Sequence, residues 1–116
     1  MYTRLGQERK AQYLRGAKIT CEAIIRYIEK HAEKARILAA QAEDPEQKAL
    51  YELIARDCAH IAAAPPETYH QAVQWLQFAI MTDRMVGHGN GYGRLDLYLG
   101  EFYRRDVARG VLTRQQ

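Results

Sequence analysis

The sequence predicts an all-α fold of about four helices, in a single segment that spans residues 1–116. Apolar residues recur at steps of three and four along most of the chain, which is the periodicity of one face of an α-helix, and no stretch alternates as a half-buried strand would. Prolines, glycines and helix-capping residues interrupt this pattern at three places. We expect helices at roughly 8–42, 45–62, 69–86 and 96–109, with a glycine-rich loop over residues 87–93.

The first predicted helix carries one apolar stripe, with Arg, Lys and Glu on the opposite face. Asp44 and Pro45 mark the start of the second helix, because an acidic N-cap followed by proline at the first helical position favours helix initiation. The second helix again has one apolar face, which includes Cys58 and Ile61. The stripe of the first helix comprises Leu14, Ala17, Cys21, Ile24, Ile28, Ala32, Ala35, Leu38 and Ala42.

The third predicted helix follows a double proline and begins with a capping box of Thr68 and Gln71. Between residues 72 and 81 it is apolar on nearly every side, which is typical of a helix buried in a core. The remainder of this chain offers little to cover it. We therefore expect exposed apolar surface, and with it self-association or weakly cooperative unfolding of the isolated chain.

A glycine-rich loop precedes the fourth predicted helix, which Gly110 would end as a C-terminal cap. Glycine is used where the backbone turns with positive φ or closely approaches another group, so four alternating glycines indicate a loop of defined shape. Arg94 and Asp96 form a solvated pair, or Asp96 caps the last helix, or both residues fix the loop in place. The predicted structural loop comprises Gly87, Gly89, Gly91, Gly93, Arg94 and Asp96.

Composition argues against several classes of protein. The net charge of +3 is spread along the chain instead of gathered on one face, so we expect no nucleic-acid partner. The longest apolar run is far shorter than a membrane span, and the first residues do not resemble a signal peptide. We therefore expect a cytoplasmic protein without a membrane partner. Cys21 and Cys58 lie within helical patterns, which predicts buried thiols and no disulfide.

No catalytic or metal site is predicted. The sequence contains no serine, and its threonines lie at helix caps or in charged contexts, so no nucleophile–base pair can be named. The glycine-rich loop lacks the Gly-Lys-Ser/Thr ending of a phosphate-binding loop. The histidines never fall at metal-ligand spacing from a carboxylate or cysteine partner. They are His31, His60, His70 and His88.

Two blocks of sequence resemble one family. The first starts at Pro65 and reads Pro-Pro-Glu-Thr-Tyr-His-Gln-Ala-Val-Gln-Trp, and the second starts at Gly93 and reads Gly-Arg-Leu-Asp-Leu-Tyr-Leu, with Phe102, Tyr103 and Asp106 after it. Glycyl radical enzymes, the pyruvate formate-lyase family, typically read Pro-x-x-Thr-Phe-x-Glu-Ala-Leu-Gln, then Gly-Arg-Phe-Asp-Gln-Tyr-Leu, then paired aromatics and an Asp. The chain therefore resembles an internal fragment of a glycyl radical enzyme, an incomplete piece of the helical shell around its α/β barrel.

The resemblance implies a parent enzyme of anaerobic metabolism, a lyase, dehydratase or formate acetyltransferase that acts on a small polar substrate. Such enzymes hold a radical on a glycine, installed by an S-adenosylmethionine iron–sulfur activating enzyme, and pass it to a cysteine. Cys21 and Cys58 lack the context of that cysteine, and the glycyl radical motif has no counterpart here. We expect no cofactor and no catalysis in this chain alone, with the rest of the parent enzyme as its partner.

His88 is the candidate substrate-binding residue. Counted back from Gly93, it falls on a histidine that reaches substrate hydroxyls in dehydratase-type relatives, and the alternative is a loop histidine without a role. Imidazole can donate or accept a proton near neutral pH, which suits hydroxyl recognition. The sequence departs from the dehydratase pattern at Gly89, Leu97 and Gly100, so the resemblance indicates no particular substrate.

The end of the sequence has the form of a helix start. Residues 113–116 read Thr-Arg-Gln-Gln, which has the form of a capping box with no helix after it, so we expect a chain cut from a longer one. A small autonomous helical adaptor or interaction protein is the second interpretation. A basic, helical nucleic-acid-binding domain is the third.

Overall fold

The chain folds into four α-helices in the computed structural model, which describes residues 2–87, 89 and 91–115, with residues 2–5 described by their backbone alone. The helices are α1 (Tyr2–Gln41), α2 (Pro45–Ala63), α3 (Tyr69–Met85) and α4 (Leu95–Ala108). The described part contains no strand, so the predicted all-α architecture is confirmed. None of the helices within it is long and apolar enough to cross a membrane.

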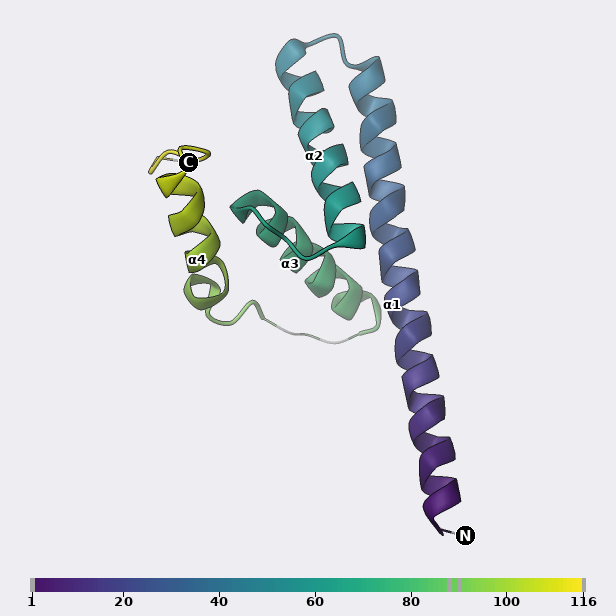
Figure 1. Cartoon of the computed structure of the whole chain (residues 1–116). Helices are drawn as coiled ribbons and strands as arrows, with labels where there is room; N and C mark the ends of the chain where they lie inside the picture. Colours follow the sequence, from purple (N-terminus) through teal and green to yellow (C-terminus); the bar gives the residue numbers. More distant parts are fainter. Residues whose placement is uncertain (1, 88, 90, 116) are drawn as a thin grey trace.

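The length of α1 sets the shape of the molecule. Its 40 residues span about 60 Å at a rise of ~1.5 Å per residue, which accounts for most of the longest dimension of 64 Å. α2 has only 19 residues, runs antiparallel to α1 and covers just its C-terminal part (Figure 1). α3 packs against both α2 and α4, and α4 lies on the far side of α3 from α1 (Figure 1). α3 therefore links the α1–α2 hairpin to α4.

The N-terminal caps of α2 and α3 are the predicted ones. The Asp44 side chain accepts a hydrogen bond from the backbone N–H of Glu46 at 3.3 Å, and Pro45 occupies the first turn. In α3 the backbone N–H of Gln71 donates to Thr68 Oγ1 at 3.2 Å, and the Thr68 N–H donates back to Gln71 Oε1 at 3.4 Å. Both caps satisfy backbone donors that the helix itself leaves unpaired.

The predicted C-terminal cap of α4 is also confirmed. Gly110 has φ of +73°, the left-handed conformation that glycine adopts without a steric cost. Its N–H donates to the Val107 carbonyl at 3.1 Å, and the Val111 N–H donates to the Asp106 carbonyl at 2.9 Å. This pair of bonds is a Schellman motif, which ends the helix and pairs two of its last carbonyl groups.

Two expectations about helix starts were wrong. α1 begins at Tyr2, well before residue 8, because its first residues contain no proline and a single Gly6 costs a helix only about 1 kcal/mol. The alternative that Asp96 caps α4 is also wrong. The N-cap position belongs to Arg94, which makes no side-chain capping bond, and Asp96 lies in the first helical turn.

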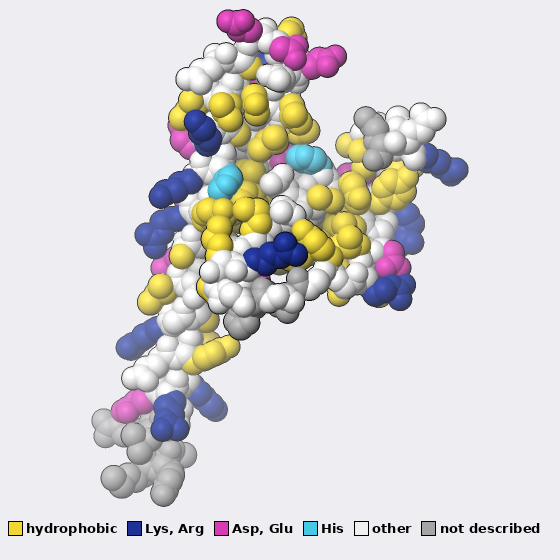
Figure 2. Space-filling model, turned by 180° about the vertical axis from the view of Figure 1, so that it is seen from behind, with side chains coloured by type: hydrophobic (Ala, Val, Ile, Leu, Met, Phe, Trp, Pro, Cys, Tyr) yellow, Lys and Arg dark blue, Asp and Glu magenta, His cyan; other side chains and the backbone are white. Residues whose placement is uncertain are grey.

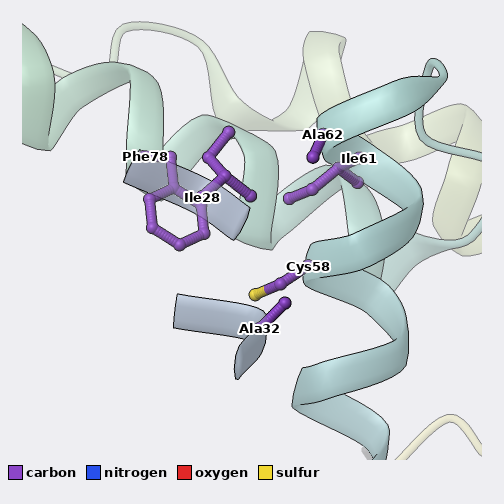
Figure 3. Packing of buried hydrophobic residues seen from close by; sticks show 6 residues of the cluster. All are labelled: Ile28, Ala32, Cys58, Ile61, Ala62 and Phe78. Atoms are coloured by element: carbon purple, nitrogen blue, oxygen red, sulfur yellow. The ribbon is translucent and has the colours of Figure 1, made fainter. Parts of the chain in front are cut away.

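One hydrophobic cluster joins α1, α2 and α3. Phe78 of α3 lies edge-on to the rings of Tyr27 and His31 on α1, with ring centroids 5.9 and 5.1 Å apart. Figure 3 shows six cluster side chains pointing into the space between the three helices. Cys58 is completely buried there, as predicted. The six residues are Ile28, Ala32, Cys58, Ile61, Ala62 and Phe78.

The predicted stripe of α1 is buried only where α2 reaches it. Ile28, Ala32 and Ala35 are buried, whereas Leu14, Ala17 and Cys21 are exposed. The expectation of a buried thiol at Cys21 was therefore wrong for this chain. The physical reason is length: α2 is about half as long as α1, so no helix packs on the N-terminal part of α1 (Figure 1).

α3 keeps part of its apolar surface open, as its sequence indicates. Ala72, Phe78 and Ile80 are buried, but Trp75 is 47% exposed and Val73 39% exposed. A tryptophan of which almost half remains in contact with solvent leaves a large apolar area uncovered. The cover available within the described residues is therefore incomplete.

We expect Phe78→Ala to lower the free energy of unfolding by about 3–5 kcal/mol, because it leaves a cavity among packed side chains. Equilibrium urea unfolding, followed by circular dichroism, measures this change. Val73→Ala is the control on the same helix, with an expected loss of roughly 0.5 kcal/mol. Equal losses in the two variants would show that the cluster around Phe78 does not hold the three helices together.

Candidate functional site: the glycine-rich loop and its supports

The glycine-rich loop leaves the end of α3 through a sharp turn. Gly87 has φ of +89°, and its N–H donates to the Arg84 carbonyl at 3.1 Å. A side chain at this position would be strained because of the left-handed backbone. His88 and Asn90 lie outside the described residues, so the predicted substrate-binding role of His88 stays a prediction.

The far end of the loop is fastened to both neighbouring helices. Tyr92 Oη donates to Gln77 Oε1 of α3 at 2.9 Å. Gly93 has φ of +64°, and a β-carbon there would lie 3.2 Å from the Tyr98 hydroxyl of α4. Gly93 therefore meets both conditions that favour glycine, a left-handed backbone and a close neighbour.

The other two predicted loop glycines differ from Gly93. A β-carbon on Gly89 or Gly91 would meet no atom of the described residues within 4 Å. The structure thus accounts for Gly87 and Gly93 by backbone conformation, and gives no such account of Gly89 and Gly91. A common role for all four glycines does not follow from it.

Arg94 and Asp96 form the predicted solvated pair. Arg94 Nε donates to Asp96 Oδ1 at 2.8 Å, and Arg94 Nη2 donates to Asp96 Oδ2 at 2.6 Å. Both side chains are mostly exposed. The guanidinium of Arg94 lowers the pKa of the Asp96 carboxyl, because it stabilises the ionised form. The pair spans the first turn of α4 and orients the entry of the loop into that helix.

A buried carboxylate at Asp57 binds α2 to the first turn of α3. His70 Nδ1 lies 2.6 Å from Asp57 Oδ2, and Gln71 Nε2 donates to Asp57 Oδ1 at 3.2 Å. Arg56 Nε also donates to Oδ1, at 3.3 Å. Asp57 is only 1% exposed, and a buried carboxylate is tolerated where hydrogen bonds satisfy it.

A second buried carboxylate, Asp106, binds α4 to the same turn of α3. The Tyr69 N–H donates to Asp106 Oδ2 at 2.7 Å, while the Tyr69 and Tyr103 rings meet edge-on at 5.8 Å. Arg105 Nη2 donates to the Glu67 carbonyl just before α3. Asp106 Oδ1 is buried without a hydrogen-bond partner among the described residues. The helix N-terminus favours a negative charge at this point.

The sequence indicated Asp106 and His70 only as members of the resembling blocks, with His70 also set aside as a metal ligand, and it gave no role to Asp57. A signal for Asp57 was available. It stands next to Cys58 on the apolar face of α2, where an unpaired carboxylate would be costly, so its position called for a partner. The partner is on another helix and could not be identified from spacing.

The other described contacts of His and Cys side chains lie within or between the helices. Burial, and secondarily the charge of Asp57, raises the pKa of the Cys58 thiol, which keeps it protonated and unreactive. His31 Nδ1 lies 2.9 Å from the Tyr27 carbonyl, and His60 Nε2 lies 2.9 Å from the Pro65 carbonyl. Within the described ranges, no three His, Cys, Asp or Glu side chains are placed to hold a metal ion.

The matching family model is described as pyruvate formate lyase-like, and it covers residues 2–116. The chain belongs to the pyruvate formate lyase-like family. The resemblance to glycyl radical enzymes is thereby confirmed, and the two sequence blocks that carry it are the loop end at Gly93 and the start of α3.

Relatives in this family are much longer than the chain. It is 38% identical over 106 residues to trans-4-hydroxy-L-proline dehydratase of Clostridioides difficile, a match that covers 89% of this chain and 13% of the relative. It is 36% identical over 107 residues to an isethionate sulfite-lyase of Nitratidesulfovibrio vulgaris, with 90% and 13% covered. The chain thus spans about an eighth of these family members.

Solved structures agree with this assignment. A structure concerned with 1,2-propanediol dehydration in Roseburia inulinivorans matches with a TM-score of 0.77 and 30% identity, over 81% of this chain and 12% of that one. A glycyl radical enzyme from Archaeoglobus fulgidus matches with a TM-score of 0.76 and 26% identity, over 93% and 16%. The four-helix arrangement therefore also occurs within larger proteins of the family.

We expect Gly93→Ala to destabilise the chain by about 1–2 kcal/mol, because alanine is strained at this φ and its methyl group would crowd the Tyr98 hydroxyl. Urea unfolding measures the loss, and Gly91→Ala is the matched control with open space around it. The double variant Gly93→Ala with Tyr98→Phe removes the crowding but not the backbone strain, so it should regain only part of the lost stability. Unchanged stability of Gly93→Ala would contradict the described loop conformation.

We expect Asp96 to titrate below the usual range of an aspartate. Its ionised form is favoured in the fold, so the contribution of the pair is present above the unfolded pKa and is lost as pH falls through the lowered folded pKa. Carboxyl ¹³C shifts in an NMR titration measure the midpoint, which Arg94→Gln raises towards the usual value. Arg104→Gln, which breaks the exposed pair with Glu101, leaves it unchanged. An Asp96 midpoint in the usual range of an aspartate, measured in the unaltered chain, would contradict this interpretation.

Proposed function

We propose that this chain acts as a helical segment of a glycyl radical enzyme, which holds the glycine-rich loop beside the substrate. The observation that carries the proposal is the family match over residues 2–116 of a chain that spans 13% of its relatives. The described geometry supports it, because the two ends of the loop are held at Gly87, at Tyr92 and at Gly93.

The reaction that we propose for the complete enzyme is a radical dehydration or lysis of a small polar substrate. The named relatives support this class, since they include two kinds of dehydratase and several sulfite-lyases. An S-adenosylmethionine activating enzyme with an iron–sulfur cluster would install the glycyl radical. Neither thiol of this chain fits the hydrogen-abstracting cysteine: Cys58 is completely buried in the hydrophobic cluster, out of reach of a substrate, and Cys21 lies on a regular stretch of α1. The chain therefore supplies support and a substrate contact, and other parts of the enzyme supply the radical.

His88 is the residue that we propose for the substrate contact. Its place between Gly87 and Gly89 puts it in the loop whose two ends α3 and α4 hold. A histidine there can donate a hydrogen bond to a substrate hydroxyl, and removing such a bond costs about 1–3 kcal/mol.

A graft tests this proposal. Residues 2–116 would replace the matching segment of the Clostridioides difficile dehydratase, and the graft would be activated without oxygen. We expect the glycyl radical signal in electron paramagnetic resonance and measurable turnover of trans-4-hydroxy-L-proline. His88→Ala should lower turnover by roughly ten- to hundredfold, because it removes one substrate hydrogen bond, while leaving the radical signal intact.

Two controls accompany the graft. Gly91→Ala changes the same loop where space is open, so its turnover should stay near that of the unaltered graft. The isolated 116-residue chain, treated with the same activating enzyme, should give no glycyl radical signal. A graft that neither folds nor forms a radical, or a radical on the isolated chain, would refute the proposed role.

A further inference from the structure

Two apolar grooves meet at Trp75. The first lies between α3 and α4, has a volume of about 430 Å³ and is lined by uncharged residues alone. The second lies between α1 and α3 and has a volume of about 400 Å³; its lining is mainly apolar but also includes Thr20, Thr82 and Asp83. The first, which we call the Trp75 groove, is formed chiefly by Pro66, Trp75, Leu76, Tyr98, Leu99 and Phe102.

Trp75 makes the two grooves one continuous apolar surface, because its side chain lines both. Figure 2 shows two groups of hydrophobic side chains in the middle of one face, with a Lys or Arg side chain between them. Within this surface the Trp75 side chain is 47% exposed and that of Tyr98 is 56% exposed. The sequence does not lack charged residues, which make up 27% of it, but none of them lines the Trp75 groove. Contiguous exposed apolar surface of this kind is typical of a surface that a partner covers.

The greater length of the family's other members indicates which partner fits. Both helices of the Trp75 groove lie within the part that the family shares, whose members continue for roughly seven further lengths of this chain. None of the residues that line the groove is charged, and the nearby Arg105 guanidinium already stacks on the Phe102 ring at 5.2 Å. Its chemistry suits an apolar segment packed against it permanently.

We propose that the Trp75 groove is the docking surface for the remainder of a glycyl radical enzyme, which covers it with apolar side chains. This inference rests on the proposed function and deepens it, since it names the face through which the helical segment joins the enzyme. Docking there also brings the loop end at Gly93 to the joint, because Tyr98 both lines the groove and contacts Gly93.

The test uses the dehydratase graft with a charge placed in the groove. Trp75→Glu and Leu99→Glu should each reduce the yield of soluble, radical-bearing graft by about tenfold or more, because an unpaired charge would be buried at the joint. Leu50→Glu is the matched control, as Leu50 of α2 is 51% exposed and lines neither groove. Circular dichroism of the isolated chain should show unchanged helix content in all three variants, which separates a docking defect from a folding defect.

Each outcome decides the question. Loss in the two groove variants, with a normal Leu50→Glu graft, supports the docking surface. Equal tolerance of all three variants overturns it while the proposed function stands. Failure of the unaltered graft overturns the proposed function itself. If sedimentation shows that the isolated chain dimerises and Trp75→Glu abolishes the dimer while the same variant is tolerated in the graft, the groove belongs to a second copy and the proposal falls.

Discussion

The described structure depends on the first turn of α3, which two buried carboxylates hold from opposite neighbours. Asp57 reaches it from α2 through His70 and Gln71, and Asp106 reaches it from α4 through the Tyr69 N–H. α3 is the helix that connects the α1–α2 hairpin to α4. Without these bonds the hydrophobic cluster would still join the first three helices, but α4 would lose its buried polar attachment to α3.

Burying a carboxylate costs free energy, but its hydrogen bonds fix the relative position of the two helices that they join. Apolar packing tolerates sliding, whereas a carboxylate that accepts from a backbone N–H fixes position to within a hydrogen-bond length. The Asp106 bond at 2.7 Å therefore fixes the C-terminal end of α4 against the first turn of α3. The loop ends at the opposite end of α4, where Tyr92 bonds to Gln77 and Gly93 closely approaches Tyr98.

Local features of this fold could be predicted from the sequence because local chemistry determines them. Asp44, Thr68 with Gln71, and Gly110 act on backbone groups within four residues of themselves, so their roles can be inferred without knowing the tertiary structure. Burial could not be predicted in this way. Cys21 and Cys58 lie in similar helical patterns, yet only Cys58 is buried, because burial depends on the length and position of α2.

The candidate site shows the same division. The pair of Arg94 and Asp96 is two residues apart and was predicted, whereas the bonds of Asp57 and Asp106 to α3 span 13 to 37 residues and were not. The resemblance to a family did indicate Asp106, because a motif can record a distant contact without revealing its geometry. The contact itself, a carboxylate on a helix N-terminus, emerges only from the structure.

The unequal lengths of α1 and α2 divide α1 into two regions of different local stability. The C-terminal region shares the hydrophobic cluster, so its amide hydrogens exchange only when that cluster opens. The N-terminal region has solvent on all sides of its described residues, and a lone helix of that length is marginal in water. Amide protection should therefore fall steadily from about Ile28 towards Tyr13. The N-terminal region of α1 should lose helix on heating while the three-helix cluster stays intact. One end of α1 is therefore held by tertiary contacts, and the helix content of the other end varies with temperature.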